Sequence, residues 1–415
     1  MSKKSPQLRF EGFTDDWEDR ELGEEFKKVS ERNDGSFGRD HWISVAKMYF
    51  QSPEKVQSNN IDTRTYVMRE GDIAFEGHPN SEFKFGRFVA NDIGAGVVSE
   101  LFPIYKHQHE YDNNYWKNAI QIERIMAPIF AKSITSSGNS SNKLDTKHFL
   151  RQKILIPQIN EQKKMGSFFK QLDNTIALHQ RKLDLLKEQK KGYLQKMFPK
   201  NGAKVPELRF AGFADDWEER KLIDVKDNED RYSYTGGPFG SDLKSSDYTE
   251  IGVRIIQLQN IGDGKFVNDY KIYTSEEKAR SLNSNLIYPG EIIIAKMADP
   301  LARATILPKI EPKYLMASDG IRLKINTDYF DNYYILTLIN SDVFRKEALN
   351  NSTGTTRKRI GLVTLGNLPM MIPSFEEQQK IGSFFKQLDD TIALHQRKLD
   401  LLKEQKKGFL QKMFV

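Results

Sequence analysis

QKKMGSFFKQLDNTIALHQRKLDLLKEQKKGYLQKMF, residues 162–198, returns almost unchanged as QQKIGSFFKQLDDTIALHQRKLDLLKEQKKGFLQKMF, residues 378–414. Of the 37 positions, 33 are identical. Pro157 and Pro373 end the segment before each copy, and Glu161 and Glu377 fall in the expected first turn, where they complement the helix dipole. We therefore expect two long helices, each roughly 55 Å at 1.5 Å per residue.

The repeated stretch has its apolar positions at alternating intervals of four and three residues, which indicates a coiled-coil seam. The seam passes through Leu172, Ile176, His179, Leu183, Leu186, Leu388, Ile392, His395, Leu399 and Leu402. Two near-identical seams in one chain favour an antiparallel pair of helices. The alternative is that each helix packs on a partner protein, which would leave the seams wet in the free chain. The two histidines are compatible with ligand or pH-switch roles, but we favour polar residues that fix the register of the pair.

A second repeat precedes each dissimilar stretch. Residues 6–22 (PQLRFEGFTDDWEDREL) match residues 206–222 (PELRFAGFADDWEERKL) at 12 of 17 positions. This pattern predicts a frame with an internal pseudo-twofold repeat that carries two divergent domains. The predicted segments are an N-terminal conserved segment (1–22), a first variable domain (23–155), a conserved helix (156–198), a copy of the N-terminal segment (199–222), a second variable domain (223–371) and a C-terminal conserved helix (372–415).

The two variable stretches are typical of α/β or mixed α+β domains with short strands. Residues 253–258 (VRIIQL) and 291–295 (EIIIA) are strand-like runs near glycine and proline. Residues 71–75 (GDIAF) correspond to residues 290–294 (GEIII). The predicted fold class is therefore mixed α/β, with two globular domains joined by two long antiparallel coiled-coil helices.

Polar segments near the end of each variable stretch are candidate DNA contacts. Residues 137–143 (SGNSSNK) align with residues 353–359 (TGTTRKR), and glycine followed by hydroxyl, amide and basic side chains suits phosphate oxygens or base edges. An ordinary solvated turn is the alternative. Residues 236–241 (GGPFGS) are compatible with an anion-binding nest of backbone amides or with a plain loop. The candidate DNA-binding residues are Asn139, Ser140, Lys143, Ser241, Lys244, Thr355, Arg357, Lys358 and Arg359.

Composition constrains the class of protein. Lysine and arginine total 63 against 57 acidic residues, so bulk charge argues only weakly for nucleic acid. Most of the surplus lies in residues 156–198, with nine basic and four acidic residues. The absence of cysteine excludes disulfides and thiolate metal sites. With no apolar run near the roughly 20 residues of a membrane span, and a polar N-terminus, we expect a soluble cytoplasmic protein without membrane contact.

Motifs of catalysis are missing. The sequence has no Walker A loop, no glycine-rich dinucleotide fingerprint and no Asp-Pro-Pro-Tyr or Asn-Pro-Pro-Tyr tetrapeptide of the kind amino-methyltransferases use. His107 and His109 have no evident third metal ligand, so a surface pair is the better interpretation. Glu-x-Lys occurs several times in this Glu- and Lys-rich chain and therefore carries little weight. We expect no catalytic, cofactor or metal site on this chain.

Over nearly its full length, the chain resembles the specificity subunit of type I restriction–modification systems. The resemblance rests on residues 17–23 (WEDRELG) and their copy 217–222 (WEERKL), and on the Ile-Pro and Glu-Gln pairs that open each long helix. Residues 238–244 (PFGSDLK) and 253–262 (VRIIQLQNIG) also look like recurrent family segments. The second domain matches better, because the first lacks a PFGS-like stretch.

The resemblance implies two target-recognition domains, each reading one half of a split double-stranded DNA site, with the helices as a ruler between them. It also implies that the helices and repeats bind two methyltransferase subunits, through which restriction–translocase subunits join. S-adenosylmethionine, ATP and Mg²⁺ would then belong to those partners. Two other classes stay open, namely a coiled-coil scaffold that binds only proteins and a stand-alone DNA enzyme with an undetected site.

Overall fold

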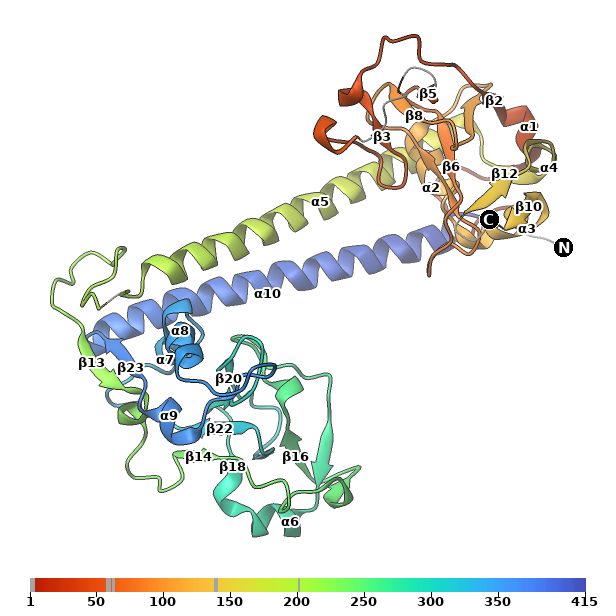
Figure 1. Ribbon diagram of the computed structural model, residues 1–415. Helices are drawn as coiled ribbons and strands as arrows, with labels where there is room; N and C mark the ends of the chain where they lie inside the picture. The colour runs from red at the N-terminus through yellow and green to blue at the C-terminus, as the bar shows by residue number, and fades with distance from the viewer. Residues whose placement is uncertain (1–3, 57–60, 62–63, 138–140, 201) are drawn as a thin grey trace. The chain divides into compact units, whose positions relative to one another are not determined.

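The structure is a computed structural model that describes all residues except 1–3, 57–60, 62–63, 138–140 and 201. The chain divides into two compact units (Figure 1). The first unit comprises Met1–Gln180 and Arg397–Val415, and the second comprises Arg181–Gln396. Each unit therefore holds one variable region, one copy of the short repeat and part of each long helix.

The two long helices have the same length. Helix α5 spans Ile159–Lys196 and helix α10 spans Phe375–Lys412, 38 residues each. Both begin two residues after the predicted proline, as expected from a residue that ends the preceding strand and leaves the helix free to start.

Ion pairs in each unit give the direction of the helices. In the first unit Lys406 Nζ of α10 lies 2.6 Å from Asp173 Oδ1 of α5. In the second unit Lys190 Nζ of α5 lies 2.5 Å from Asp389 Oδ1 of α10. From the first ion pair to the second, the residue number increases along α5 and decreases along α10. The helices therefore run antiparallel, which confirms the predicted pair within one chain.

Each variable region begins and ends on a pair of antiparallel strands. In the first unit β1 (Glu18–Glu21) pairs with β12 (Lys153–Ile156), and in the second unit β13 (Glu218–Lys221) pairs with β23 (Pro369–Ile372). Because the partners run in opposite directions, the chain leaves the frame and returns to it at the same place. Each variable region therefore starts and ends at the same strand pair of the repeated part of the chain, which we call the frame.

The first variable region is built on the four-stranded antiparallel sheet β2-β9-β6-β7. Two smaller pairs, β5-β8 and β3-β4, and the hairpin β10-β11 complete the strands. Its strands are β2 (Phe26–Val29), β3 (Ile43–Ser44), β4 (Tyr49–Phe50), β5 (Thr65–Met68), β6 (Ile73–Glu76), β7 (Arg87–Ala90), β8 (Gly96–Ser99), β9 (Ile104–His107), β10 (Ile134–Ser137) and β11 (Asn142–Leu144). Its helices are α1 (Leu22–Glu25), α2 (Asn113–Ala119), α3 (Glu123–Ser133) and α4 (Thr146–Leu150), with 3-10 turns at Arg39–His41 and Pro53–Lys55.

The second variable region has two sheets, with strand orders β14-β22-β19-β20 and β15-β17-β16-β21-β18. Its strands are β14 (Tyr234–Gly236), β15 (Tyr248–Thr249), β16 (Val253–Ile256), β17 (Ile272–Thr274), β18 (Leu286–Ile287), β19 (Ile292–Ala295), β20 (Ala304–Ile306), β21 (Tyr314–Met316) and β22 (Gly320–Leu323). Its helices are α6 (Glu276–Ser281), α7 (Asn332–Ile339), α8 (Asp342–Asn350) and α9 (Leu362–Gly366), with 3-10 turns at Leu222–Val225, Ser245–Asp247, Leu258–Asn260 and Asn283–Asn285.

The strands predicted to correspond occupy equivalent places. β6 lies between β9 and β7, and β19 lies between β22 and β20, so each is a central strand of a four-stranded sheet. Every residue of β6 and of β19 is buried, including the charged Glu76 at the end of β6. The two variable regions therefore share a sheet topology at their centres although little of their sequence matches. These results confirm the predicted mixed α/β fold class with two globular regions and a helix pair.

Candidate DNA interface

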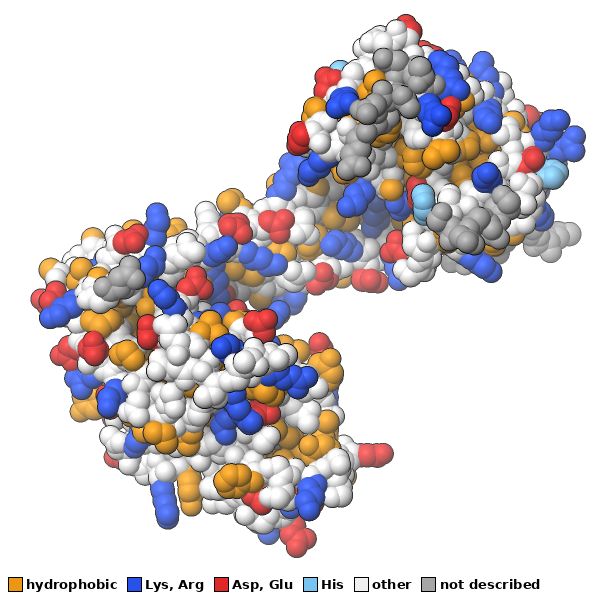
Figure 2. All heavy atoms as spheres, viewed as in Figure 1, with side chains coloured by type: hydrophobic (Ala, Val, Ile, Leu, Met, Phe, Trp, Pro, Cys, Tyr) orange, Lys and Arg blue, Asp and Glu red, His pale blue; other side chains and the backbone are white. Residues whose placement is uncertain are grey.

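The two ends of the sheet that contains β19 differ in charge. In the view of Figure 2, basic side chains are interspersed with acidic ones. β19 begins after Glu291 and ends before Lys296, and the neighbouring strands run antiparallel to it. The chain segments at the Glu291 end and at the Lys296 end can therefore be compared directly.

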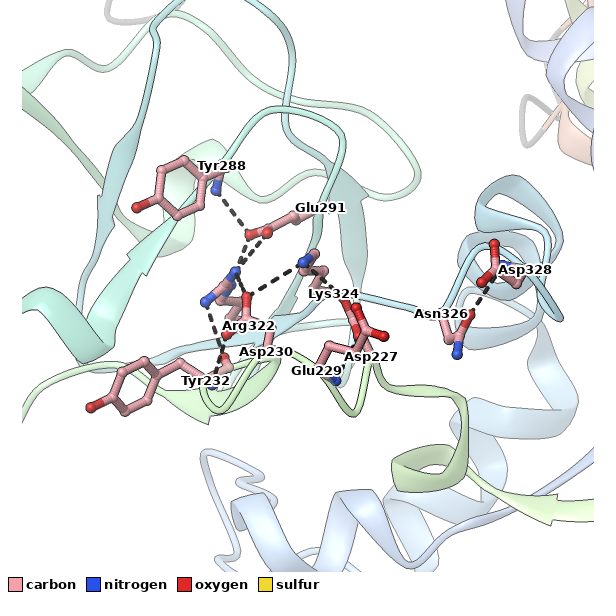
Figure 3. A network of polar contacts seen from close by, with 10 residues as sticks. All are labelled: Asp227, Glu229, Asp230, Tyr232, Tyr288, Glu291, Arg322, Lys324, Asn326 and Asp328. Atoms are coloured by element: carbon pink, nitrogen blue, oxygen red, sulfur yellow. Dashed lines mark hydrogen bonds and ion pairs between the residues drawn. The ribbon is translucent and has the colours of Figure 1, made fainter.

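At the Glu291 end the cations are neutralised (Figure 3). The guanidinium of Arg322 donates to Glu291 at 2.8 and 2.6 Å and to Asp230 at 2.7 Å. Lys324 Nζ lies 2.7 Å from Asp227 Oδ2, and this ammonium lowers the pKa of the Asp227 carboxyl. Arg322 and Glu291 are almost fully buried, at 3% and 8% exposure. An end with three carboxylates around two paired cations repels phosphate, so we name it the acidic end.

At the opposite end Lys296 ties a hairpin to the sheet. Its Nζ donates to the carbonyl of Ser318 at 3.1 Å, and its backbone carbonyl accepts from the N–H of Ile360 at 3.0 Å. Arg359 forms an ion pair with Asp319 beside it. Burial lowers the pKa of the Lys296 ammonium, and the nearby Arg359 lowers it further. We call this the basic end.

The hairpin at the basic end is the segment that the sequence singled out, residues 353–359. Thr353 and Arg359 exchange two backbone hydrogen bonds of 2.9 Å. Gly354 has a φ of +91°, and an added β-carbon would lie 2.5 Å from the Arg357 carbonyl oxygen, so the turn requires glycine there.

The candidate side chains of this hairpin face solvent. Thr355, Arg357 and Lys358 are exposed. Among the described residues, neither Arg357 nor Lys358 has a side-chain hydrogen bond or ion-pair partner, whereas Arg359 is engaged with Asp319. The hairpin thus presents two cations that remain available to an external anion.

The glycine-rich loop starts at the same end. The N–H of Gly237 donates to the Gly320 carbonyl at 2.8 Å, and an added β-carbon would lie 1.9 Å from the Ala317 carbonyl oxygen. That amide is already bonded within the protein, which favours the plain-loop interpretation over an anion-binding nest. Ser241 and Lys244 lie further along the loop, and both are exposed.

The first unit has a matching arrangement after its central strand β6. The N–H of Asn142 donates to the Gly77 carbonyl at 2.8 Å, as that of Ile360 does to Lys296. An added β-carbon at Gly77 would lie 2.2 Å from the Asn142 carbonyl oxygen, so hairpin and strand end touch closely. Lys143 of β11 is exposed, and His78 pairs with the buried Glu76. Asn139 and Ser140 lie outside the described residues.

None of the predicted seam residues is fully exposed to solvent. Leu183, Leu186 and Leu399 are buried, and the other seven are half-buried: Leu172, Ile176, His179, Leu388, Ile392, His395 and Leu402.

Sequence reasoning missed four leucines outside the seam. In the first unit Leu178 and Leu401 are 66% and 58% exposed, and in the second unit Leu185 and Leu394 are 52% and 58% exposed. The available signal was a leucine at a heptad position other than the seam, identical in both copies of the repeat. Each unit therefore presents one exposed leucine from each helix.

Sequence reasoning also missed how the short repeat holds the helices. In the first unit Arg9 donates to Glu161 by two hydrogen bonds of 2.7 Å, and in the second unit Arg209 donates to Glu377 by two of 2.8 Å. Both glutamates are essentially inaccessible, at 1% and 0% exposure. Opposite charges at identical places in both repeats were the available signal. These bidentate pairs fix the first turn of each long helix to the short repeat that precedes each variable region.

The described part of the chain contains no helix long and apolar enough to cross a membrane. Within the same residues, no group of three or more histidine, aspartate or glutamate side chains could hold a metal ion.

Comparisons with known proteins cover most of the chain. A family model described as "Type I restriction modification DNA specificity domain" matches residues 14–188 and 215–404. The chain is 24% identical over 359 residues to the type I restriction enzyme MjaVIII specificity subunit of Methanocaldococcus jannaschii, covering 84% of this chain and 80% of that protein.

Solved structures show the same fold. The crystal structure of the type-I restriction-modification system S subunit from M. genitalium matches with a TM-score of 0.61 at 14% identity, covering 99% of both chains. A chain from a structure on complex assembly and conformational transition of the type I R-M system matches with a TM-score of 0.54 at 18% identity, covering 96% of this chain and 97% of the other. Since the family model spans both halves of the sequence, this chain belongs to the family of type I restriction–modification DNA specificity proteins.

Proposed function

We propose that the protein is the DNA sequence-specificity subunit of a type I restriction–modification complex, a recognition subunit without catalysis of its own. Each variable region, 23–155 and 223–371, reads one half of a bipartite target, while the helices set the spacing of the half-sites. The observation that carries the proposal is a backbone contact that recurs in both units: the N–H of Asn142 or of Ile360, within or next to an aligned polar segment, donates to the residue that follows the central strand. Two such segments held in the same way on divergent regions suit one target read in two halves.

The chemistry of the hairpins supports contact with DNA. Phosphate contacts position a protein on the duplex, and base-edge contacts supply the specificity. In the second region Arg357 and Lys358 suit phosphates or guanine edges, and Thr355 and Ser241 suit either kind of contact. Lys244 and Arg359 flank them, and Asn139, Ser140 and Lys143 are the corresponding candidates in the first region.

The frame supplies surfaces for protein partners. Apolar side chains that gather into an exposed patch mark sites of interaction with other proteins. One exposed leucine from each helix in each unit gives two equivalent patches, Leu178 with Leu401 and Leu185 with Leu394. We propose that two identical methyltransferase subunits dock there, one on each unit, as the internal repeat suggests.

Catalysis is assigned to those partners. The methyltransferase subunits bind S-adenosylmethionine, and the restriction–translocase subunits that join through them use ATP and Mg²⁺. We place the complex in the cytoplasm, where its double-stranded DNA substrate lies.

Co-expression with the methyltransferase subunit and genome-wide mapping of modified adenines tests the proposal. We expect one bipartite motif with a fixed gap. Modification at scattered sites, or at one continuous motif, would contradict it.

A charge-removal experiment tests the proposed interface. The double variant Arg357→Ala/Lys358→Ala should weaken binding of the assembled complex to its target and lower the log–log salt slope by about two, because each lost phosphate contact removes about one unit. Arg359 is retained because its ion pair with Asp319 holds the hairpin. Affinity measured across a series of salt concentrations gives both quantities.

The matched control removes the same charge from the acidic end. Arg231 follows Asp230, and Lys309 follows β20, whose Ile306 pairs with Ile292 at this end. Both side chains are exposed, and Arg231→Ala/Lys309→Ala should leave affinity and slope unchanged. Equal effects of the two double variants would show that only net charge matters, and an unchanged slope in the hairpin variant would exclude the hairpin from the interface.

A further inference from the structure

Phe239 is an exposed aromatic side chain in the second unit. Its side chain is 81% exposed, and among the described phenylalanines only Phe50, at 37%, is otherwise exposed. Single exposed apolar residues are common on protein surfaces and need no function. Exposure alone therefore does not make this ring a functional candidate, whereas its position in the fold does.

The loop that presents Phe239 is anchored on both sides. Before it, Asn285 donates to the Gly236 carbonyl at 2.8 Å, and Gly237 is bonded to Gly320. After it, the N–H of Asp242 donates to the Phe239 carbonyl at 2.9 Å, and the side chain of Leu243 is buried. A ring on a loop fixed at both ends loses little conformational freedom when it is inserted elsewhere.

Phe239 also lies at the basic end of the sheet. β14 runs from the acidic end, where Arg322 donates to the carbonyl of Tyr232, to Gly237 beside the turn that holds Lys296 and Arg359. A duplex drawn to Arg357 and Lys358 by its phosphates would meet the ring on the same end of the sheet. Gly240, the next residue, has open space where a β-carbon would stand, so the backbone can approach a partner closely.

We propose that Phe239 inserts into the base stack of the half-site read by residues 223–371; this rests on the proposed function. A phenyl ring stacks on any base, and apolar wedges between base steps are a known means of deforming a duplex. Basic surroundings favour nucleic acid over an apolar protein partner for this ring. The first region has no PFGS-like stretch, so only one of the two half-sites receives a wedge.

The test uses the full chain assembled with its methyltransferase subunits. 2-Aminopurine replaces each purine of both half-sites in turn, except the methylated adenines, and its fluorescence is read on binding. In the unaltered complex we expect a rise at one step of the half-site read by residues 223–371 and none in the other half-site. Phe239→Ala should abolish that rise and weaken binding roughly 5- to 100-fold, while Phe239→Trp should keep both.

Tyr329→Ala is the matched control, because Tyr329 is an aromatic residue, 67% exposed, at the acidic end. It should leave fluorescence and affinity unchanged. A fluorescence rise that persists in Phe239→Ala, or Phe239→Ala weakening assembly with the methyltransferase subunits in the absence of DNA, would overturn the proposal. A bipartite methylation pattern with an unchanged rise overturns only the wedge, whereas loss of any bipartite pattern in the unaltered complex contradicts the proposed function itself.

Discussion

At the scale of residues, each variable region contains an aspartate whose side chain packs on a long helix. Asp112 caps α2 and Asp331 caps α7, each accepting a backbone hydrogen bond of 2.7 Å. Each carboxylate also packs on a glycine of a long helix: a β-carbon at Gly166 would lie 1.9 Å from Asp112 Oδ1, and one at Gly382 would lie 2.0 Å from Asp331 Oδ1. Each of these contacts thus joins a glycine of a conserved helix to an aspartate of a divergent region.

A buried carboxyl makes the stability of the first unit sensitive to pH. Asp72 is 7% exposed and accepts the N–H of Arg69 at 2.8 Å. Burial raises the pKa of Asp72 to about 6. The pKa of Asp72 in the folded protein lies above its value in the unfolded chain, so the folded state is favoured most while this carboxyl is protonated. That contribution to the free energy of unfolding is present at low pH and is lost as the pH rises through about 6.

Asp72→Asn keeps the acceptor for Arg69 and removes the ionisation. We expect the variant to match the parent near pH 4 and to be more stable at pH 8, on the order of 1–3 kcal/mol. Thermal unfolding across this pH range measures the difference. If thermal stability changed with pH in the same way in both proteins, ionisation of Asp72 would not lower the stability of the folded protein.

At the scale of elements, the antiparallel pairing fixes how the helices can be shortened. The ion pairs Asp173–Lys406 and Lys190–Asp389 belong to the same register. Removing residues 183–189 from α5 alone would shift one ion pair against the other by seven residues. Removing residues 399–405 from α10 as well restores both pairs and the alternation of the seam.

The double heptad deletion shortens the pair by about 10 Å, or roughly three base pairs. We expect it to fold and to keep both half-sites, with a gap two or three base pairs shorter in the methylated motif. The single deletion is the control and should fold poorly. An unaltered gap in an active double deletion would show that the helices hold the units together without setting the spacing.

At the scale of the whole molecule, each region leaves and rejoins the frame on one strand pair. Exchange of residues 223–371 for the segment of a relative should therefore change one half of the methylated motif only. The donor segment has to supply the aspartate that packs on Gly382, because the frame cannot replace it. Methylome mapping reads the outcome, and a motif changed in both halves, or in neither, would rule out independent readers.

If the proposed function is correct, catalysis is carried out by the partner subunits and not by this chain. We expect the purified chain to transfer no methyl group from S-adenosylmethionine and to cleave no DNA with ATP and Mg²⁺. We expect DNA methylation once the methyltransferase subunit alone is added to the chain. Activity that copurifies with the single chain through repeated chromatography would refute this assignment.

The sequence by itself determined the architecture, because that information is local and duplicated. Heptad spacing from Leu172 to Leu186 specifies a long helix, and two copies of it specify a pair. The correspondence of residues 71–75 with 290–294 was also visible, since a buried central strand needs a mostly apolar run whatever surrounds it.

Only the tertiary structure decided which groups meet. Arg9 and Glu161 are 152 residues apart, and the spacing along the chain says nothing of a contact that the β1–β12 pair creates. The same holds for the two ends of the β19 sheet: Lys296, Asp319 and Arg359 come from three separate loops, and folding alone gathers them. The periodicity of apolar residues in the sequence indicates which side of a helix or strand is buried. The partner of a charged side chain depends instead on which loops the folded sheet brings to the same edge.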